Sequence, residues 1–211
     1  MTEQIKNIIE NLEKRQISAY YAEDKNEAVS VVNSLICDMG KELSKDEKDI
    51  KVSWGGSVTL DDLGLRDICR ERYYSPDPYK APDPNEAKRE ALLSDVFLMS
   101  SNAITERGEL MNIDGNGNRV AALIYGPRRV IVVVGVNKIV KDTKEALARI
   151  KSVTCPLNAK RLLRDTPCAK TGKCGDCKIG GNTMCSHIVT TRFSSVPYRI
   201  KVVIVNDSLG Y

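Results

Sequence analysis

The chain has 211 residues, of which 42% are hydrophobic and 28% are charged, and these values are ordinary for a globular protein with one sizeable α/β core. No apolar run approaches the roughly 20 residues that cross a bilayer, and the polar start of the chain lacks the apolar stretch of a signal peptide, so we expect a cytoplasmic protein without a membrane span. Aromatic residues make up 5% of the chain, and no nucleic-acid motif accompanies its net charge of +4, which argues against a nucleic-acid partner.

The first quarter of the chain alternates between helical and strand-like patterns. Ile5, Ile8, Ile9 and Leu12 recur at helical spacing, and the Thr2 side chain can cap the first turn. In chain order we expect this helix, a strand at 17–21 and a second helix capped by Asp24 or Asn26. An exposed charged connection at 41–49, part of which could continue that helix, leads to a strand at 50–54.

Residues 55–100 begin with a glycine turn and contain a proline-rich stretch. The four prolines between positions 75 and 84 remove backbone donors and restrain their neighbours, so this stretch cannot be a helix or a central strand. We interpret it as a surface loop that could serve as a lid. Around it we expect a helix at 61–72, a helix at 86–93 capped by Asp83 or Asn85, and a buried strand at 95–100.

The clearest strand is at residues 130–136, where a continuous β-branched run is typical of a central strand covered on both faces. A helix at 142–152 and a strand at 198–205 follow. Strands that alternate with helices favour an α/β fold with a mostly parallel, doubly wound sheet. We expect one domain over residues 1–211, with an N-terminal helical region at about 1–40 and a cysteine-rich C-terminal insertion at about 155–190.

A glycine turn, Gly55-Gly56-Ser57, connects a predicted strand to a predicted helix. Glycines allow close backbone approach, and the first amides of a helix beside the Ser57 and Thr59 hydroxyls can bind an anion. A plain tight turn uses the same residues, and the sequence contains neither of the classical nucleotide-binding fingerprints.

A second glycine-rich stretch, Asp114 to Arg119, superficially resembles the start of a calcium loop. Such a loop needs glycine at its sixth position and glutamate at its twelfth, and this chain has Arg119 and Tyr125 there, which argues against calcium. The spacing alone favours a tight turn in which Asn118 caps a helix.

Three blocks of sequence in the middle of the chain, at 101–110, 114–120 and 126–138, resemble the lactate-utilisation (LUD) domain family. The glycine turn with Thr59 and Leu60 and the closing residues 208–211 also fit, so the resemblance covers essentially the whole chain. It implies an α/β fold similar to the sugar-phosphate isomerase and CoA-transferase group. It further implies a part in oxidising lactate to pyruvate alongside iron–sulfur oxidoreductase partner subunits.

The same resemblance suggests which residues form a ligand cleft. It implies that Gly55, Gly56, Ser57 and Thr59 hold a phosphate or carboxylate, and that the cleft is lined by Asn102, Thr105, Glu106, Asp114, Asn118, Arg119 and Lys138. Glu106 is the candidate base or nucleophile, because CoA-transferase-like enzymes use a cleft glutamate covalently. The alternative is a carboxylate that only pairs with Arg119 or Lys138.

Four of the seven cysteines lie close together, in the pattern Cys168-x5-Cys174-x2-Cys177-x7-Cys185. Thiols stay reduced in the cytoplasm, so this density indicates metal or redox chemistry before disulfides. Irregular spacing favours a [4Fe–4S] cluster over zinc, which usually shows two close ligand pairs. A redox pair at Cys174 and Cys177 and reduced thiols without metal remain open. His187 and Cys155 are further candidate ligands, whereas Cys37 and Cys69 are expected to be core thiols.

The cysteine segment is also the basic part of the chain. Between positions 158 and 178 only Asp165 and Asp176 oppose six cations, which are Lys160, Arg161, Arg164, Lys170, Lys173 and Lys178. These cations could balance an anionic thiolate cluster, guide an acidic partner or substrate, or form a solvated face.

Three functions stay open at this level. The first is a subunit of a lactate or 2-hydroxy acid oxidation system that binds an anionic ligand and relays electrons through its cluster. The second is a stand-alone transferase or isomerase acting through Glu106 on a CoA or sugar-phosphate ligand. The third is a non-catalytic assembly or regulatory subunit with a structural zinc. Because no flavin or nicotinamide fingerprint is present, hydride chemistry on lactate would need a partner.

Overall fold

The computed structural model describes residues 1–77, 80–177 and 183–211. Its centre is a five-stranded sheet in the order β1-β9-β6-β3-β2, in which every neighbouring pair is parallel. The strands are β1 (Ser18–Ala22), β2 (Val52–Trp54), β3 (Val96–Met99), β6 (Arg129–Gly135) and β9 (Ile200–Val205). β6 is in the middle and is buried at every position, as its β-branched run predicts.

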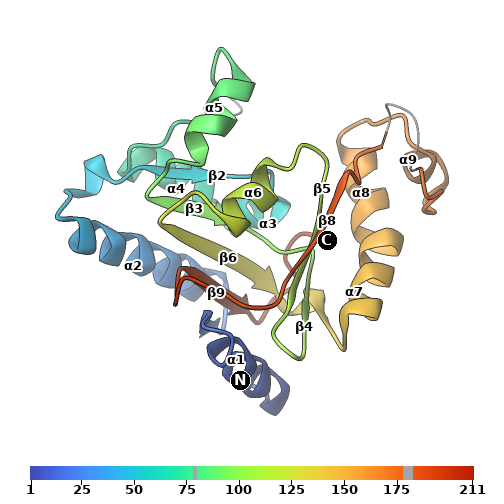
Figure 1. Ribbon diagram of the computed structural model, residues 1–211, viewed down its shortest axis with the longest axis horizontal. Helices are drawn as coiled ribbons and strands as arrows, with labels where there is room; N and C mark the ends of the chain where they lie inside the picture. Colours follow the sequence, from blue (N-terminus) through green and yellow to red (C-terminus); the bar gives the residue numbers. More distant parts are fainter. Residues whose placement is uncertain (78–79, 178–182) are drawn as a thin grey trace.

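Helices cover both faces of this sheet, which confirms the predicted doubly wound α/β fold (Figure 1). One face packs against α2 (Lys25–Leu43), α3 (Val58–Asp62) and α4 (Leu65–Arg72). The other face packs against α1 (Glu3–Glu13), α5 (Pro84–Ala91) and α6 (Asn118–Ile124). Residues alternate along β6, so that Ile131 and Val133 enter the first core and Val130, Val132 and Val134 enter the second.

Several helix boundaries follow the predicted caps. The Thr2 hydroxyl accepts a hydrogen bond from the Ile5 amide, the Asp24 carboxylate from Glu27, and the Asp83 carboxylate from Asn85 and Glu86. α2 runs on to Leu43, so part of the expected connection at 41–49 is helical, and a short 3₁₀ turn, η1 (Glu47–Asp49), follows it.

The predicted helix at 61–72 is two helices instead of one. Ser57 caps a short helix that starts at Val58, and the chain then breaks at Gly64, whose φ of 62° is left-handed and favours glycine. The proline-rich loop begins after Tyr74, and Arg70 holds its Asp77 carboxylate at 2.6 Å. Pro78 and Tyr79 of the predicted lid lie outside the described residues.

A second sheet, which the sequence did not predict, lies beside the first. It has the order β7-β4-β5-β8 and is mixed, since β5 is antiparallel to both of its neighbours. Its strands are β4 (Ala103–Thr105), β5 (Leu110–Asp114), β7 (Ile139–Val140) and β8 (His187–Thr191). β7 follows the short 3₁₀ turn η2 (Val136–Lys138). Met111 and Ile113 of β5 pack against Ala146 and Ile150 in a third core cluster.

The segment 143–161 runs through three helical elements end to end, as Figure 1 shows for its two α-helical parts. These are α7 (Thr143–Arg149), the π turn η3 (Ile150–Thr154) and α8 (Cys155–Arg161). The Cys155 amide donates to the Ile150 carbonyl five residues back, and Pro156 has no amide to donate. The predicted helix at 142–152 therefore continues past a proline because the π turn accommodates it.

α9 (Pro167–Thr171) carries Cys168, the first of the four clustered cysteines, and residues 183–186 lead the chain back into β8. Lys178 of the basic segment lies outside the described residues. No helix within the described ranges is long and apolar enough to cross a membrane. The extent of the domain and the cytoplasmic location stay predictions.

Candidate functional site

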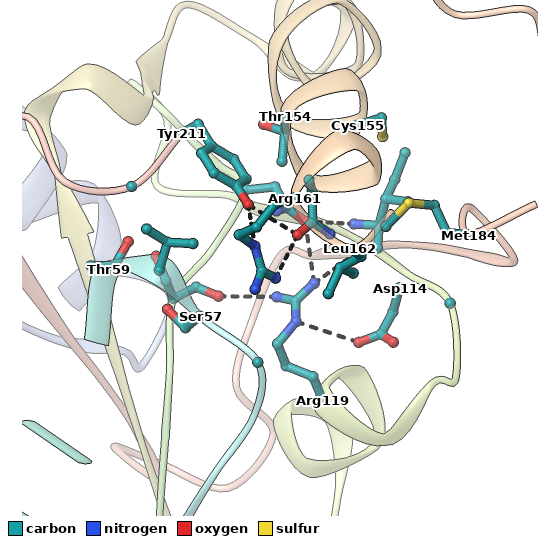
Figure 2. Close-up of a pocket in the computed structure, with 18 of the residues that line it drawn as sticks. Ser57, Thr59, Asp114, Arg119, Thr154, Cys155, Arg161, Leu162, Met184 and Tyr211 are labelled. Atoms are coloured by element: carbon teal, nitrogen blue, oxygen red, sulfur yellow. Dashed lines mark hydrogen bonds and ion pairs between the residues drawn. The ribbon is translucent and has the colours of Figure 1, made fainter. Parts of the chain in front are cut away.

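A cavity of about 470 Å³ opens at the carboxyl ends of the parallel strands (Figure 2). Its lining comes from the residues that follow β2, β3, β6 and β9, from the loop between β5 and α6, and from α8. The carboxyl ends of parallel strands are where open α/β sheets bind their ligands. This position makes the cavity the candidate site.

The cavity brings together eight of the residues that the sequence singled out, which are Gly56, Ser57, Thr59, Asn102, Asp114, Asn118, Arg119 and Lys138. Gly55 lies directly behind the lining, where a Cβ atom would stand 3.0 Å from Cγ of Arg119. Gly117 (φ 84°), not Asn118, is the N-cap of α6, and Asn118 is the first residue of that helix.

Thr105 and Glu106 do not line this cavity. Thr105 is buried in β4, and its hydroxyl contacts Glu109. Glu106 is exposed, and its carboxylate accepts a hydrogen bond of 2.8 Å from the side-chain amide of Gln4 rather than pairing with Arg119 or Lys138. It lines a separate hollow between α1 and the end of β7. Its catalytic role therefore stays a prediction that the cavity does not support.

Arg119 is the most heavily bonded side chain of the site. Its guanidinium donates to the Ser100 and Ile113 carbonyls at 3.0 and 2.8 Å, and it also bonds the side-chain oxygens of Asn102 and Asn112. Nε lies 3.4 Å from the Asp114 carboxylate. Ser100 follows β3 of the first sheet, whereas Ile113 belongs to β5 of the second. Arg119 therefore joins the two sheets at the wall of the cavity.

Lys138 is a buried lysine, only 3% exposed, that lines the same cavity. Its Nζ atom donates to the Thr59 hydroxyl at 2.7 Å and to the Ser100 hydroxyl at 2.9 Å. Burial, together with the positive charges of Arg149 and Arg119, lowers the pKa of Lys138 to about 7, and Asp62 opposes this shift only weakly. The amine is therefore divided between its charged and neutral forms near neutral pH.

Four further cations line the cavity, and sequence reasoning did not place them there. They are Arg66 from α4, Lys88 from α5, Arg161 from α8 and Arg164 beyond it. Figure 2 shows Arg161 and Arg119 pointing toward one another across the cavity, with Tyr211 above them. Arg161 donates to the Tyr211 hydroxyl at 2.7 Å. The basic segment was the only sequence signal for Arg161 and Arg164, and it did not reveal which surface they would face.

The cavity is consequently strongly electropositive. Among the described lining residues, Asp114 is the single side-chain carboxylate, whereas six side chains are basic: Arg66, which pairs with Asp61 at 3.1 Å, the partly charged Lys138, and Lys88, Arg119, Arg161 and Arg164. Asp114 is already engaged, since it accepts a hydrogen bond from the Gly117 amide and pairs with Arg119. A ligand that neutralises this surplus must carry negative charge.

The cysteine segment packs beside the cavity without forming a closed ligand set. The Sγ atoms of Cys155 and Cys185 lie 3.4 Å apart, whereas Cys168 contacts Thr166, Cys177 contacts Thr183, and Cys174 is exposed. Across residues 1–77, 80–177 and 183–211, no three Cys, His, Asp or Glu side chains are grouped to hold a metal ion. The [4Fe–4S] cluster and its alternative, zinc, stay predictions.

Three side chains that the sequence set apart from the four clustered cysteines have clear positions. His187 lies against Gly117 of the cavity loop, where a Cβ atom would stand 3.1 Å from its Nε2. Cys69 is fully buried in the first core, and burial raises the pKa of its thiol to about 12. Cys37 is half-buried and lies 3.8 Å from the Tyr73 hydroxyl. The prediction that Cys69 is a core thiol is confirmed.

The contact between Cys155 and Cys185 leads to a chemical prediction. The hydrogen bond between the two thiols lowers the pKa of Cys185 and raises that of Cys155. Their Sγ atoms need to approach by only about 1.4 Å to reach disulfide bonding distance. We expect diamide to oxidise the metal-free protein at this pair, taking up the two electrons and two protons that the thiols release. Peptide mapping under non-reducing conditions should find Cys155 joined to Cys185 and Cys69 still free, and a dominant Cys174–Cys177 bridge would contradict this.

Comparisons with known proteins add family information to this geometry. A family model described as LUD domain matches residues 5–205. The crystal structure of a DUF162 family protein from Deinococcus radiodurans has a TM-score of 0.53 at 11% identity, with 96% of each chain covered. The structure of eIF2B delta from Chaetomium thermophilum has a TM-score of 0.29 at 16% identity, covering 54% of this chain and 50% of the other. Among curated protein sequences no match was found. The first of these structures shows the same fold over nearly the whole chain.

Proposed function

The chain belongs to the LUD domain family, and from this premise we propose that it binds a small organic anion, a 2-hydroxy acid such as lactate or the corresponding 2-oxo acid, within a lactate-utilisation system. The family match agrees with the resemblance found in the sequence blocks at 101–138. The family match names neither a ligand nor a role within such a system, and both are proposed here.

The observation that carries the proposal is the charge of the cavity. Five cations, the partly charged Lys138 and one already paired carboxylate surround a space of about 470 Å³, which lies within the range of small-molecule sites. Asn102, Asn118 and Asn158 add neutral donors and acceptors to the lining. A carboxylate bound here gains charge-assisted hydrogen bonds, and a hydroxyl or carbonyl group next to it can bond to the amides.

A stand-alone transferase or isomerase that uses Glu106 receives less support. Glu106 lies outside the cavity, and Asp114, the carboxylate within the described lining, is held by the Gly117 amide and Arg119. Neither is placed to act as a nucleophile or base on a ligand in this cavity. Phosphate-bearing ligands belong to the same anionic class, so the binding experiment below includes them as separate arms.

We further propose that this chain works with partner subunits and an iron–sulfur cluster in that system. We propose that a partner supplies the oxidising chemistry, since the sequence has no flavin or nicotinamide fingerprint. Within the described residues no three candidate ligands are grouped to hold a metal ion, so no electron-transfer step is derived through the thiols. Iron and zinc analysis after anaerobic purification tests the cofactor: about four irons per chain would support a cluster, whereas one zinc and no iron would support the structural alternative.

Arg161 provides the direct test of anion binding. We expect Arg161→Gln to weaken the binding of pyruvate or lactate about tenfold, because one charge-assisted hydrogen bond is worth roughly 1.5 kcal/mol or more. The arginine is exposed, so the substitution should leave the fold intact. Isothermal titration calorimetry with pyruvate, lactate, ribose 5-phosphate and coenzyme A in separate arms measures the effect and identifies the preferred class of anion.

Two control variants accompany this test. Lys160→Gln removes a positive charge from the neighbouring position of α8, and Lys160 is exposed and outside the cavity lining. Glu106→Gln alters the exposed carboxylate that lies in the other hollow. We expect both to bind the ligand like the unmodified chain. Equal weakening by Arg161→Gln and Lys160→Gln would show a diffuse charge effect instead of a site, and no binding of any of these anions would overturn the proposed function.

A further inference from the structure

Lys138 is placed in a way that simple anion binding does not require. It ends the 3₁₀ turn that follows the central strand β6, and it is 3% exposed although a lysine normally keeps its ammonium group in water. In the described ranges of the chain, no carboxylate lies within ion-pair distance of its Nζ atom, whereas Arg119 and Arg149 both act on its charge. A lysine that only had to attract an anion would be more strongly charged in an exposed position.

The hydrogen bonds around Nζ suit a neutral amine. The Thr59 hydroxyl donates to the Leu209 carbonyl and the Ser100 hydroxyl to the Ser101 carbonyl, so both hydroxyl oxygens are acceptors for Lys138. Two N–H groups of Lys138 are therefore engaged in these hydrogen bonds. A neutral amine has two N–H groups and one lone pair, so the lone pair is what remains for a ligand in the cavity.

The electrostatic surroundings keep a large share of this amine neutral. Burial and the two guanidinium groups bring the pKa of Lys138 to about 7. At neutral pH the fraction of Lys138 in the neutral, nucleophilic form is therefore roughly a thousandfold larger than that of an exposed lysine. Lysines that are desolvated or placed next to another cation are the ones that attack carbonyl groups in enzymes.

We propose that Lys138 is a nucleophile that forms a Schiff base with the carbonyl carbon of a 2-oxo acid held in the cavity by its carboxylate. This inference rests on the proposed function, because the carboxylate must be bound in the same cavity. Nζ forms a bond to the carbonyl carbon while the carbonyl oxygen takes up a proton to give a carbinolamine. The loss of one water molecule then gives the imine, and the Thr59 and Ser100 hydroxyls, which bond to Nζ, are placed to move the proton. No oxidant or reductant takes part in this step.

Reductive trapping tests the proposal on the full chain. The protein is incubated with pyruvate and sodium cyanoborohydride, which reduces an imine to a stable secondary amine. Intact mass spectrometry should show one adduct per chain, and peptide mapping should place it on Lys138. The rate of trapping should increase as the pH rises through 7, following the deprotonation of the amine.

Lys138→Arg and Lys201→Arg form a matched pair of variants. Burial also lowers the pKa of Lys201, but this lysine lies in β9, bonds to the Ser18 hydroxyl and is outside the cavity. Trapping should fall at least about tenfold in Lys138→Arg, since a guanidinium does not form the imine, and should persist in Lys201→Arg. Peptide mapping of the unmodified protein gives the answer even if Lys138→Arg does not fold.

The outcomes separate this inference from the proposed function. If pyruvate binds in the calorimeter but no adduct forms on Lys138 at any pH, the Schiff base is excluded and anion binding stands. Adducts scattered over exposed lysines at equal rates also exclude it. If pyruvate and lactate do not bind at all, the proposed function fails together with the inference that rests on it.

Discussion

Lys138→Met is expected to make the protein more stable while weakening the binding of the anionic ligand. The folded state lowers the pKa of this lysine from its ordinary 10.5 to about 7, so the charged amine reduces the free energy of unfolding. A shift of that size corresponds to no more than about 5 kcal/mol, and the two hydrogen bonds that Met loses are worth about 1 kcal/mol each. The net gain in the free energy of unfolding should therefore be on the order of 3 kcal/mol.

The pH dependence fixes the sign of this effect. Between pH 7 and pH 10.5 the unfolded chain holds a proton on Lys138 that the folded chain has released, so the stability of the unmodified protein rises with pH across this window. Below pH 7 both states are protonated and the full penalty is present. The advantage of Lys138→Met should be largest at about pH 6 and should turn into a small loss at about pH 10, where the two lost hydrogen bonds outweigh the remaining penalty.

Urea denaturation at both pH values measures the gain, and calorimetry with pyruvate measures the loss of binding. Lys201→Met serves as the control, because Lys201 is less completely buried and lies outside the cavity. It should give a smaller stability change and leave ligand binding intact. If Lys138→Met were no more stable than the unmodified protein at about pH 6, the charged amine of Lys138 would not destabilise the folded state, which contradicts a pKa lowered by burial and neighbouring cations.

Arg119→Met should produce the opposite result, a large loss of stability. The substitution leaves the Ser100 and Ile113 carbonyls without their donor and leaves the Asp114 carboxylate without its ion-pair partner in a buried place. Removing one member of a buried charged pair typically costs about 3–5 kcal/mol. Arg119→Lys keeps the charge but not the planar arrangement of donors, so it should still lose about 2 kcal/mol.

Arg129 is the matched control for this test, because both arginines are 9% exposed. Arg129 bonds mainly to Glu42, whose side chain is 56% exposed, so that its carboxylate can exchange this partner for water. Arg129→Met should therefore cost less than half as much as Arg119→Met in the free energy of unfolding, measured by urea denaturation. Equal losses would mean that burial alone, and not the joining of the two sheets, makes Arg119 important.

The parallel sheet could be predicted because its strands are local, strongly apolar patterns. The run Val130 to Val134 faces a core on both sides, so every position is β-branched and aliphatic. A run of five such residues is typical of a buried strand and too short to indicate a helix. The caps at Thr2, Asp24 and Asp83 were also visible, since a capping side chain acts on amides two or three residues away. These features depend on neighbours in the sequence.

The second sheet could not be read in the same way. β7 has two residues and β4 has three, which is too few to show the alternation of apolar and polar residues that predicts a strand. β5 has Asn112 and Asp114 at buried positions, where apolar residues would have indicated a strand. The Asn112 oxygen accepts a hydrogen bond from Arg119, and Asp114 pairs with Arg119 and accepts a hydrogen bond from the Gly117 amide, so both side chains depend on residues that follow the strand. A contact of that kind has no pattern in the sequence.

The site was predicted in part for the same reason. Gly56, Ser57, Thr59 and Lys138 follow parallel strands, and such residues gather at one edge of the sheet. Glu106 belongs to the same sequence block as Asn102, but the chain passes through β4 between them and carries Glu106 to the other end of that strand. Arg161 reaches the cavity only because the long helical segment leads back across it.

The π turn at Ile150–Thr154 has an evolutionary consequence. A π turn amounts to one residue inserted into an α-helix, and each residue of an α-helix turns the chain by about 100°. Deleting a single residue here would restore a regular helix and rotate Asn158 and Arg161 away from the cavity, while Arg149, which precedes the turn, kept its hydrogen bond to the Asn102 carbonyl. Relatives that lack this one residue should therefore have lost the α8 cation of the cavity or regained it at another position.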